Sequence, residues 1–113
     1  MNLLKNNINL KIMKEIELPK NLGMNGFSDK KIVDNDLIDI SLLTEIKGYI
    51  VAELTPRATI NLRHSSYGLK HKCENYIGKY VSNGQFIASM ILVGYKYKQD
   101  DINAYFNIKS IRN

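Results

Sequence analysis

The stretch Ser65–Gly94 reads SSYGLKHKCENYIGKYVSNGQFIASMILVG, and it decides how the rest of the chain is interpreted. Its first half places apolar residues at helical spacing and predicts a helix over residues 66–77. A serine at its start, Ser65 or Ser66, can act as the N-cap. Gly78 stands just past the expected end, where glycine is common because it adopts the left-handed conformation without strain.

The second half of this stretch begins another helix. Ser82 is followed three residues later by Gln85, which is the spacing of a capping box. The apolar run that follows predicts a helix over residues 83–93, which Gly94 ends. A tight turn is therefore expected between two helices.

Upstream, five apolar residues recur at spacings of three and four and predict a helix over residues 37–53: Leu37, Ile40, Leu43, Ile46 and Ile50. Asp36 is the expected N-cap, and Pro56 prevents the helix from continuing. The connection that follows, residues 57–64, is expected to be irregular or extended.

Period-two alternation predicts strands at both ends of the chain. Tyr95–Lys98 and Ala104–Ile108 alternate, and residues 99–103 between them form a loop of hairpin length with turn-forming residues. Apolar residues also alternate over residues 8–18, so a strand is expected there, ended by Pro19; the alternative is a frayed, partly ordered N-terminus. A single strand is not stable alone, so it must pair within the fold or across a homodimer.

The order of these elements predicts an α+β fold with an N-terminal strand, three helices and a C-terminal β-hairpin. Three helices followed by a hairpin are the order of a winged helix-turn-helix module. We expect residues 1–35 to form an extension of strand and glycine-containing loop, and residues 36–113 to form the helical module with its hairpin. The expected core residues are Leu43, Ile46, Ile50, Leu69, Cys73, Ile77, Phe86, Met90 and Ile91.

The composition is that of one globular domain in a reducing compartment. The chain has 113 residues, of which 44% are hydrophobic and 24% charged, so a disordered chain is not expected. Cys73 is the only cysteine, which excludes an intramolecular disulfide. The first residues lack the apolar core of a signal peptide, and no apolar run approaches the roughly 20 residues that span a bilayer. We expect a cytoplasmic protein that does not bind a membrane.

The charge is concentrated in the second half of the chain. Residues 1–55 hold 7 Lys and Arg against 8 Asp and Glu, a net charge of −1, whereas residues 56–113 hold 9 against 3, a net charge of +6. Such asymmetry favours a polyanion, including nucleic acid, or an acidic protein surface as partner. The alternative is that these charges form an ordinary solvated surface.

The helix expected over residues 83–93 is poorly suited to the recognition of DNA bases. In a helix-turn-helix motif the helix after the turn presents polar residues to the major groove. Here only Asn83, Gln85 and Ser89 have side chains that could reach a base. A helix so apolar on nearly all sides is expected in the core.

Basic and hydroxyl residues elsewhere form the candidate site for a partner or a nucleic acid. They gather around the start of the second helix, where backbone N–H groups favour an anion, and on the hairpin. The candidates are Arg57, Arg63, His64, Ser66, Lys70, Lys72, Lys79, Lys96 and Lys98. Each has a structural alternative; Arg63, for example, can stack on Tyr67 or pair with an Asp.

The residues give no pattern for catalysis, a metal or a cofactor. Structural zinc needs four ligands, usually with short spacings, and this chain has one cysteine and two histidines, His64 and His71. His71 and Cys73 are two residues apart on a helix and so do not face each other. We expect a protein that is not an enzyme and that holds no cofactor.

Three segments resemble a small module found in proteins of phages, prophages and other mobile elements. They read TINLRHSSYGLKH over residues 59–71, YVSNGQFIA over 80–88 and NAYFN over 103–107. The resemblance covers residues 57–108, about half of the chain. It implies an accessory protein that inhibits a host nucleic-acid-handling defence machine, as anti-CRISPR proteins do. The partner would then be a host effector protein or nucleoprotein complex, and the alternative is a winged-helix transcriptional regulator that binds DNA.

Overall fold

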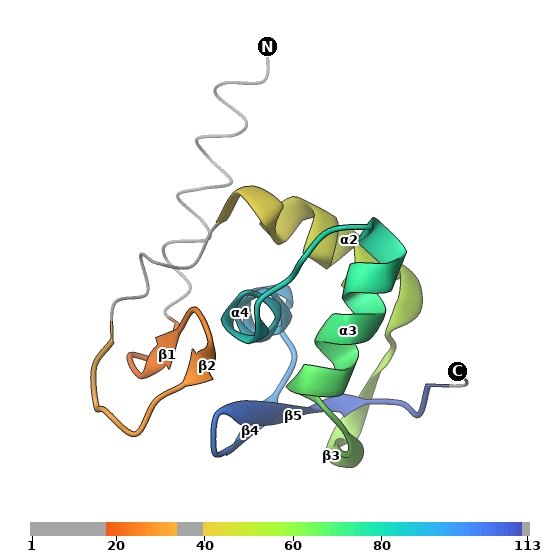
Figure 1. Ribbon diagram of the computed structural model, residues 1–113. Helices are drawn as coiled ribbons and strands as arrows, with labels where there is room; N and C mark the ends of the chain where they lie inside the picture. Colours follow the sequence, from red (N-terminus) through yellow and green to blue (C-terminus); the bar gives the residue numbers. More distant parts are fainter. Residues whose placement is uncertain (1–17, 34–39, 112–113) are drawn as a thin grey trace, which may run out of the picture.

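Figure 1 shows the computed structural model, which describes residues 18–33 and 40–111. The strand predicted over residues 8–18 lies outside these residues apart from Leu18, and so does the homodimer contact expected of it. Asp36, the expected N-cap of the first helix, and residues 37–39 also lie outside.

Three α-helices form where the apolar spacing predicted them. α2 spans Leu43–Glu53 and follows a short 3-10 turn, η2, at Ile40–Leu42. α3 spans Ser66–Ile77 and α4 spans Asn83–Val93. The last two have the bounds expected from the sequence, because strong local signals mark both of their ends.

Both ends of α4 and the C-terminal end of α3 follow the capping signals, whereas Ser65 stands at the N-cap of α3 without a side-chain capping hydrogen bond. Ser82 Oγ accepts a hydrogen bond from the Gln85 N–H at 3.0 Å, and the Gln85 side chain accepts one from the Ser82 N–H at 3.0 Å. The capping box is therefore complete. Gly78 and Gly94 end α3 and α4 with φ of 74° and 111°, a conformation that strains residues with a side chain.

A three-stranded antiparallel sheet completes the fold. β3 spans Pro56–Ser65, β4 spans Tyr97–Asp100 and β5 spans Asn103–Ile108, in the order β3-β5-β4. β4 and β5 form the expected hairpin, with Asp101 in its turn at a φ of 53°. β3 shifts register twice against β5, so parts of it bulge away from its partner.

The helices lie on one side of the sheet, with α3 against β3 and β5 and with α2 packed on α3 and α4, which gives an α+β fold (Figure 1). Phe86 of α4 meets Phe106 of β5 edge to face, with ring centroids 6.2 Å apart. Seven of the nine expected core residues are buried, and Ile77 and Ile91 pack against them while partly exposed. The core prediction is thus confirmed.

A small hairpin covers the start of α4, in a segment expected to be a loop. Its strands are β1, Leu22–Gly23, and β2, Gly26–Phe27. The Gly84 N–H donates to the carbonyl of Met24 at 2.9 Å. A Cβ on Gly84 would lie 1.8 Å from the carbonyl oxygen of Gly23, so this approach requires glycine at position 84.

Candidate functional site

The nine residues predicted to bind a partner do not share one surface. They lie on β3 (Arg57, Arg63 and His64), on α3 (Ser66, Lys70 and Lys72), in the turn between α3 and α4 (Lys79), and at β4 (Lys96 and Lys98). Their surroundings decide which of them are available to a partner.

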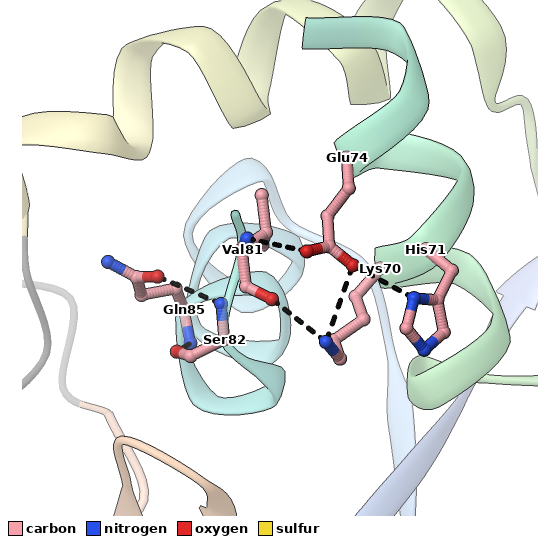
Figure 2. A network of polar contacts seen from close by, with 6 residues as sticks. All are labelled: Lys70, His71, Glu74, Val81, Ser82 and Gln85. Carbon is pink, nitrogen blue, oxygen red and sulfur yellow. Dashed lines mark hydrogen bonds and ion pairs between the residues drawn. The ribbon is translucent and has the colours of Figure 1, made fainter. Parts of the chain in front are cut away.

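Lys70 is buried and holds the turn between α3 and α4 (Figure 2). Its Nζ donates to the Val81 carbonyl at 3.1 Å and lies 3.4 Å from Glu74 Oε1. Glu74 Oε2 accepts from the Val81 N–H at 3.2 Å, so Lys70 and Glu74 both bond to the same residue after the turn. The surface position expected for Lys70 is corrected: its ammonium group serves the fold.

Three exposed rings surround this ion pair. Lys70 Nζ lies 4.9 Å from the ring centroid of Tyr80 and 5.7 Å from that of Tyr67. His71 meets Tyr67 edge to face, with centroids 4.6 Å apart, and its Nδ1 lies 2.9 Å from Glu74 Oε1. Tyr67 is 56% exposed and Tyr80 66%. We call Tyr67, His71 and Tyr80 the aromatic patch.

Two further candidates use their polar groups inside the molecule. Ser66 is fully buried, and its Oγ accepts from the Ala104 N–H at 3.1 Å, which ties α3 to β5. Its hydroxyl is therefore not available to an anion, although the sequence had suggested that Ser66 could contact one. Lys79 is exposed but pairs with Glu45 of α2 at 2.8 Å.

The two arginines of β3 differ in their contacts. Arg57 is exposed, and its guanidinium donates to the carbonyls of Thr59 and Ile60 at 3.0 and 3.2 Å, which supports a bulge in its own strand. Arg63 is exposed, and its guanidinium forms no hydrogen bond or ion pair with the described residues. The stacking on Tyr67 that was considered for Arg63 is not formed, and Lys70 approaches that ring instead.

The remaining candidates have intermediate or exposed positions. His64 and Lys72 are partly buried, and Lys72 lines a cleft with Tyr49 and Tyr76. Lys96 and Lys98 are exposed at β4. These last two stay candidates for direct contact with a partner.

The three polar residues of α4 expected to reach a base are all buried. Asn83 Nδ2 donates to the Ile102 carbonyl at 3.1 Å and to Asn103 Oδ1 at 3.0 Å. Ser89 Oγ donates to the Gln85 carbonyl at 2.8 Å, and Gln85 belongs to the capping box. In this arrangement α4 presents none of these side chains to a DNA groove.

Cys73 occupies the core position expected of it. It is fully buried. Burial, and to a smaller extent the nearby Glu74 carboxylate, raise the pKa of its thiol to about 12. Within residues 18–33 and 40–111, no three His, Cys, Asp or Glu side chains gather in a way that could hold a metal ion.

The sequence analysis missed Glu74, the residue that joins the cluster together. It follows His71 by three residues and Lys70 by four, which is the spacing of interacting pairs on a helix, so a local signal existed. No such signal marked Tyr80, because Tyr80 is distant from Lys70 in the sequence and contacts it only after the turn between α3 and α4 has brought the chain back to α3.

Comparison with protein-family models, with curated proteins and with solved structures finds no match to this chain. Over the described residues, no helix combines the length and the apolar character needed to cross a bilayer.

Proposed function

We propose that this protein is a non-enzymatic binding protein that inhibits a host nucleic-acid-handling machine, and that it contacts this target through the aromatic patch. The supporting observation is that Tyr67 and Tyr80 are exposed while Lys70 lies against both rings. Tyrosines contribute strongly to protein interfaces because they bury a large area and lose little conformational entropy. Rings already held in place lose even less.

The charges beside the aromatic patch favour a protein over a nucleic acid at this position. Lys70 and His71 both contact Glu74, and Lys79 pairs with Glu45. Nucleic-acid affinity depends on cations that replace the counterions of phosphates, and cations already paired with carboxylates do this poorly. The surface offered is mainly aromatic.

The target class follows from the resemblance of residues 57–108 to modules of mobile elements. Short accessory proteins of that origin often inhibit host defence. Such an inhibitor acts stoichiometrically, by covering a surface that its target needs, so the proposal requires no catalytic group from this chain.

The test compares a double change of exposed tyrosines in the aromatic patch with a single change of an exposed tyrosine outside it. Tyr67 and Tyr76 lie on α3 and are 56% and 54% exposed, but nine residues, two and a half turns, separate them and place them on opposite sides of the helix. A target captured from host lysate is purified and titrated with each variant. The Tyr67→Ala/Tyr80→Ala variant should bind it roughly 30-fold more weakly or worse, and Tyr76→Ala should bind as wild type does.

Circular dichroism shows whether each variant is folded before binding is measured. Inhibition of the target should reach completion at one equivalent of protein. Loss of binding in Tyr76→Ala together with retention in the Tyr67→Ala/Tyr80→Ala variant would reject the aromatic patch as the contact. Repeated turnover of a substrate by this chain would reject a purely binding role.

A winged-helix DNA-binding regulator is the second candidate. The order α2, β3, α3, α4, β4, β5 and the strand order β3-β5-β4 support a winged helix-turn-helix arrangement. DNA reading by α4 would, however, require the β1–β2 hairpin to move away, and the tip of the wing carries Asp100 and Asp101, which phosphates repel.

A gel shift with random duplex DNA separates the two candidates. The regulator should bind duplex DNA without any protein partner, with an affinity that falls steeply between about 50 and about 200 mM salt. The inhibitor should instead bind its protein target in the absence of DNA.

A further inference from the structure

The outer face of the sheet is defined by the alternation of β5. Phe106 faces the helices, so its neighbours Tyr105 and Asn107 face away from them. Lys98 lies directly across from Tyr105 in β4. Lys96 lies across from Asn107, and its N–H donates to Asn107 Oδ1 at 2.7 Å.

Two more cations extend this face beyond Asn107, Arg57 in the neighbouring strand β3 and Lys109 just after the end of β5. Pro56 pairs with the buried Ile108, so the next residue, Arg57, lies opposite Asn107, whose Nδ2 donates to the Arg57 carbonyl at 2.8 Å. Lys109 follows Ile108, and alternation places it on the same face. We call the following six residues the outer sheet face: Arg57, Lys96, Lys98, Tyr105, Asn107 and Lys109.

The cations of this face keep their charge uncompensated. All four are exposed, and none of them forms an ion pair within the described part of the chain. The hydrogen bonds of Arg57 go to neutral carbonyls of its own strand. Asp100 is the carboxylate that shares the face, at the hairpin end. Lys70 and His71 of α3 thus contact a carboxylate, whereas the four cations of the outer sheet face form no ion pair with the described residues.

The centre of the outer sheet face is rigid and aromatic. The Asn107 side chain bonds to the backbone of both neighbouring strands, at Lys96 and at Arg57. Beside it lies the partly exposed ring of Tyr105, with Lys98 across from it. A ring among cations is the combination that binds single strands, because bases stack on the ring while phosphates meet the cations.

A single strand fits this face better than a duplex. Stacking on Tyr105 requires an unpaired base, which a duplex does not offer. The narrow part of the sheet that could enter a duplex groove is the β4–β5 turn, and its Asp100 and Asp101 repel phosphates. A strand can lie across the flat face and avoid that turn.

We propose that the outer sheet face binds single-stranded nucleic acid, with phosphates at Arg57, Lys96, Lys98 and Lys109 and a base stacked on Tyr105. This site goes beyond the proposed function, because it uses none of the residues of the aromatic patch. A protein with both sites would hold its target on α3 and a nucleic-acid strand on the sheet.

The test measures fluorescence anisotropy of labelled single-stranded DNA and RNA of about 12 nucleotides with the whole protein. Binding should be detected with up to about 100 µM protein at about 50 mM salt. A plot of the logarithm of affinity against that of salt concentration should have a slope of about −2.8 for four phosphate contacts to a single strand. Lys96→Ala/Lys98→Ala should reduce the slope to about −1.4.

The matched control removes the same charge elsewhere. Lys30 and Lys31 are exposed in the segment after β2, and Lys30→Ala/Lys31→Ala should leave the slope unchanged. Tyr105→Leu keeps an apolar side chain and should weaken binding about tenfold without changing the slope, because it removes stacking alone.

Three results would overturn this site: equal salt slopes for the two double-lysine variants, tighter binding of a duplex of the same length, or no binding of any oligonucleotide over this range. Binding of polyglutamate in place of oligonucleotides would reassign the face to acidic proteins. None of these results involves Tyr67 or Tyr80, so each leaves the proposed function to its own test.

Discussion

At the level of single residues, burial separates lysines that look alike in the sequence. Lys70 and Lys79 each lie close to a carboxylate, Glu74 and Glu45 respectively. The side chain of Lys70 is 8% exposed, whereas that of Lys79 is 57% exposed. Water and salt screen an exposed pair, but removal of one member of a buried pair leaves the other charge poorly solvated.

We therefore expect Lys70→Ala to lower the free energy of unfolding by about 2–4 kcal/mol, because Glu74 and the buried Val81 carbonyl each lose a donor. Lys79→Ala should change it by less than about 0.5 kcal/mol. Urea denaturation followed by circular dichroism measures both values. Equal stability of the two variants would show that the contacts of Lys70 make no net contribution.

At the level of elements, two helical glycines test the contact between the β1–β2 hairpin and α4. A Cβ on Gly48 of α2 would meet open space, whereas a Cβ on Gly84 would meet the backbone of Gly23 and Met24. Alanine is favoured over glycine in a helix interior by about 1 kcal/mol. Gly48→Ala should therefore raise the free energy of unfolding by up to about 1 kcal/mol, and Gly84→Ala should lower it.

Hydrogen exchange locates the damage. The Phe27 N–H donates to the Ile102 carbonyl at 3.0 Å, so its exchange reports whether the hairpin stays in place. It should become faster in Gly84→Ala and stay unchanged in Gly48→Ala. Slow exchange at Phe27 in both variants would mean that the hairpin tolerates the added methyl group.

The elements that were predictable from the sequence are those with signals inside their own residues. The capping box of Ser82 and Gln85 and the glycines after α3 and α4 marked both ends of α4 and the C-terminal end of α3. Lys98 and Tyr105 belong to a hairpin that period-two alternation indicated.

The elements that were missed depend on contacts distant in the sequence. β1 and β2 have two residues each and depend on contacts with α4 and with the β4–β5 turn, through Gly84 and Ile102. The burial of Lys70 likewise depends on Val81, eleven residues away and beyond a turn. Because a lysine on a helix usually faces water, the spacing of Lys70 and Glu74 did not by itself indicate that the pair is buried.

At the level of the whole molecule, the positive half of the chain divides into two surfaces of different kinds. On α3 Lys70 and His71 contact Glu74 beside exposed rings, whereas on the outer sheet face the four cations form no ion pair among the described residues and lie around Tyr105. A count of Lys and Arg along the sequence does not distinguish these two surfaces. The proposals for a protein target and for a nucleic-acid strand both follow from this division.

The folded protein should also lose stability in alkaline solution. Burial raises the pKa of Tyr49 from 10.0 to about 12 and that of Cys73 from 9.0 to about 12. Each group keeps its proton in the folded state at a pH where the unfolded chain has released it, so the unfolded state binds fewer protons. The stabilisation is complete below pH 9.0 and is lost as the pH rises towards about 12, by up to about 1.4 kcal/mol per pH unit for each group.

Urea denaturation at a series of pH values from about 8 to about 11 measures this loss. Tyr49→Phe keeps the edge-to-face contact with Tyr76, whose ring centroid lies 5.3 Å away, and removes only the hydroxyl. Its free energy of unfolding should therefore fall less steeply with pH above 10.0 than that of the wild type. Tyr76→Phe removes the hydroxyl of the partner ring, which belongs to a residue that is 54% exposed, and serves as the matched control. If the Tyr49→Phe and wild-type curves stay parallel over this range, the Tyr49 hydroxyl ionises as readily in the folded protein as in the unfolded chain, and burial at α2 does not hold its proton.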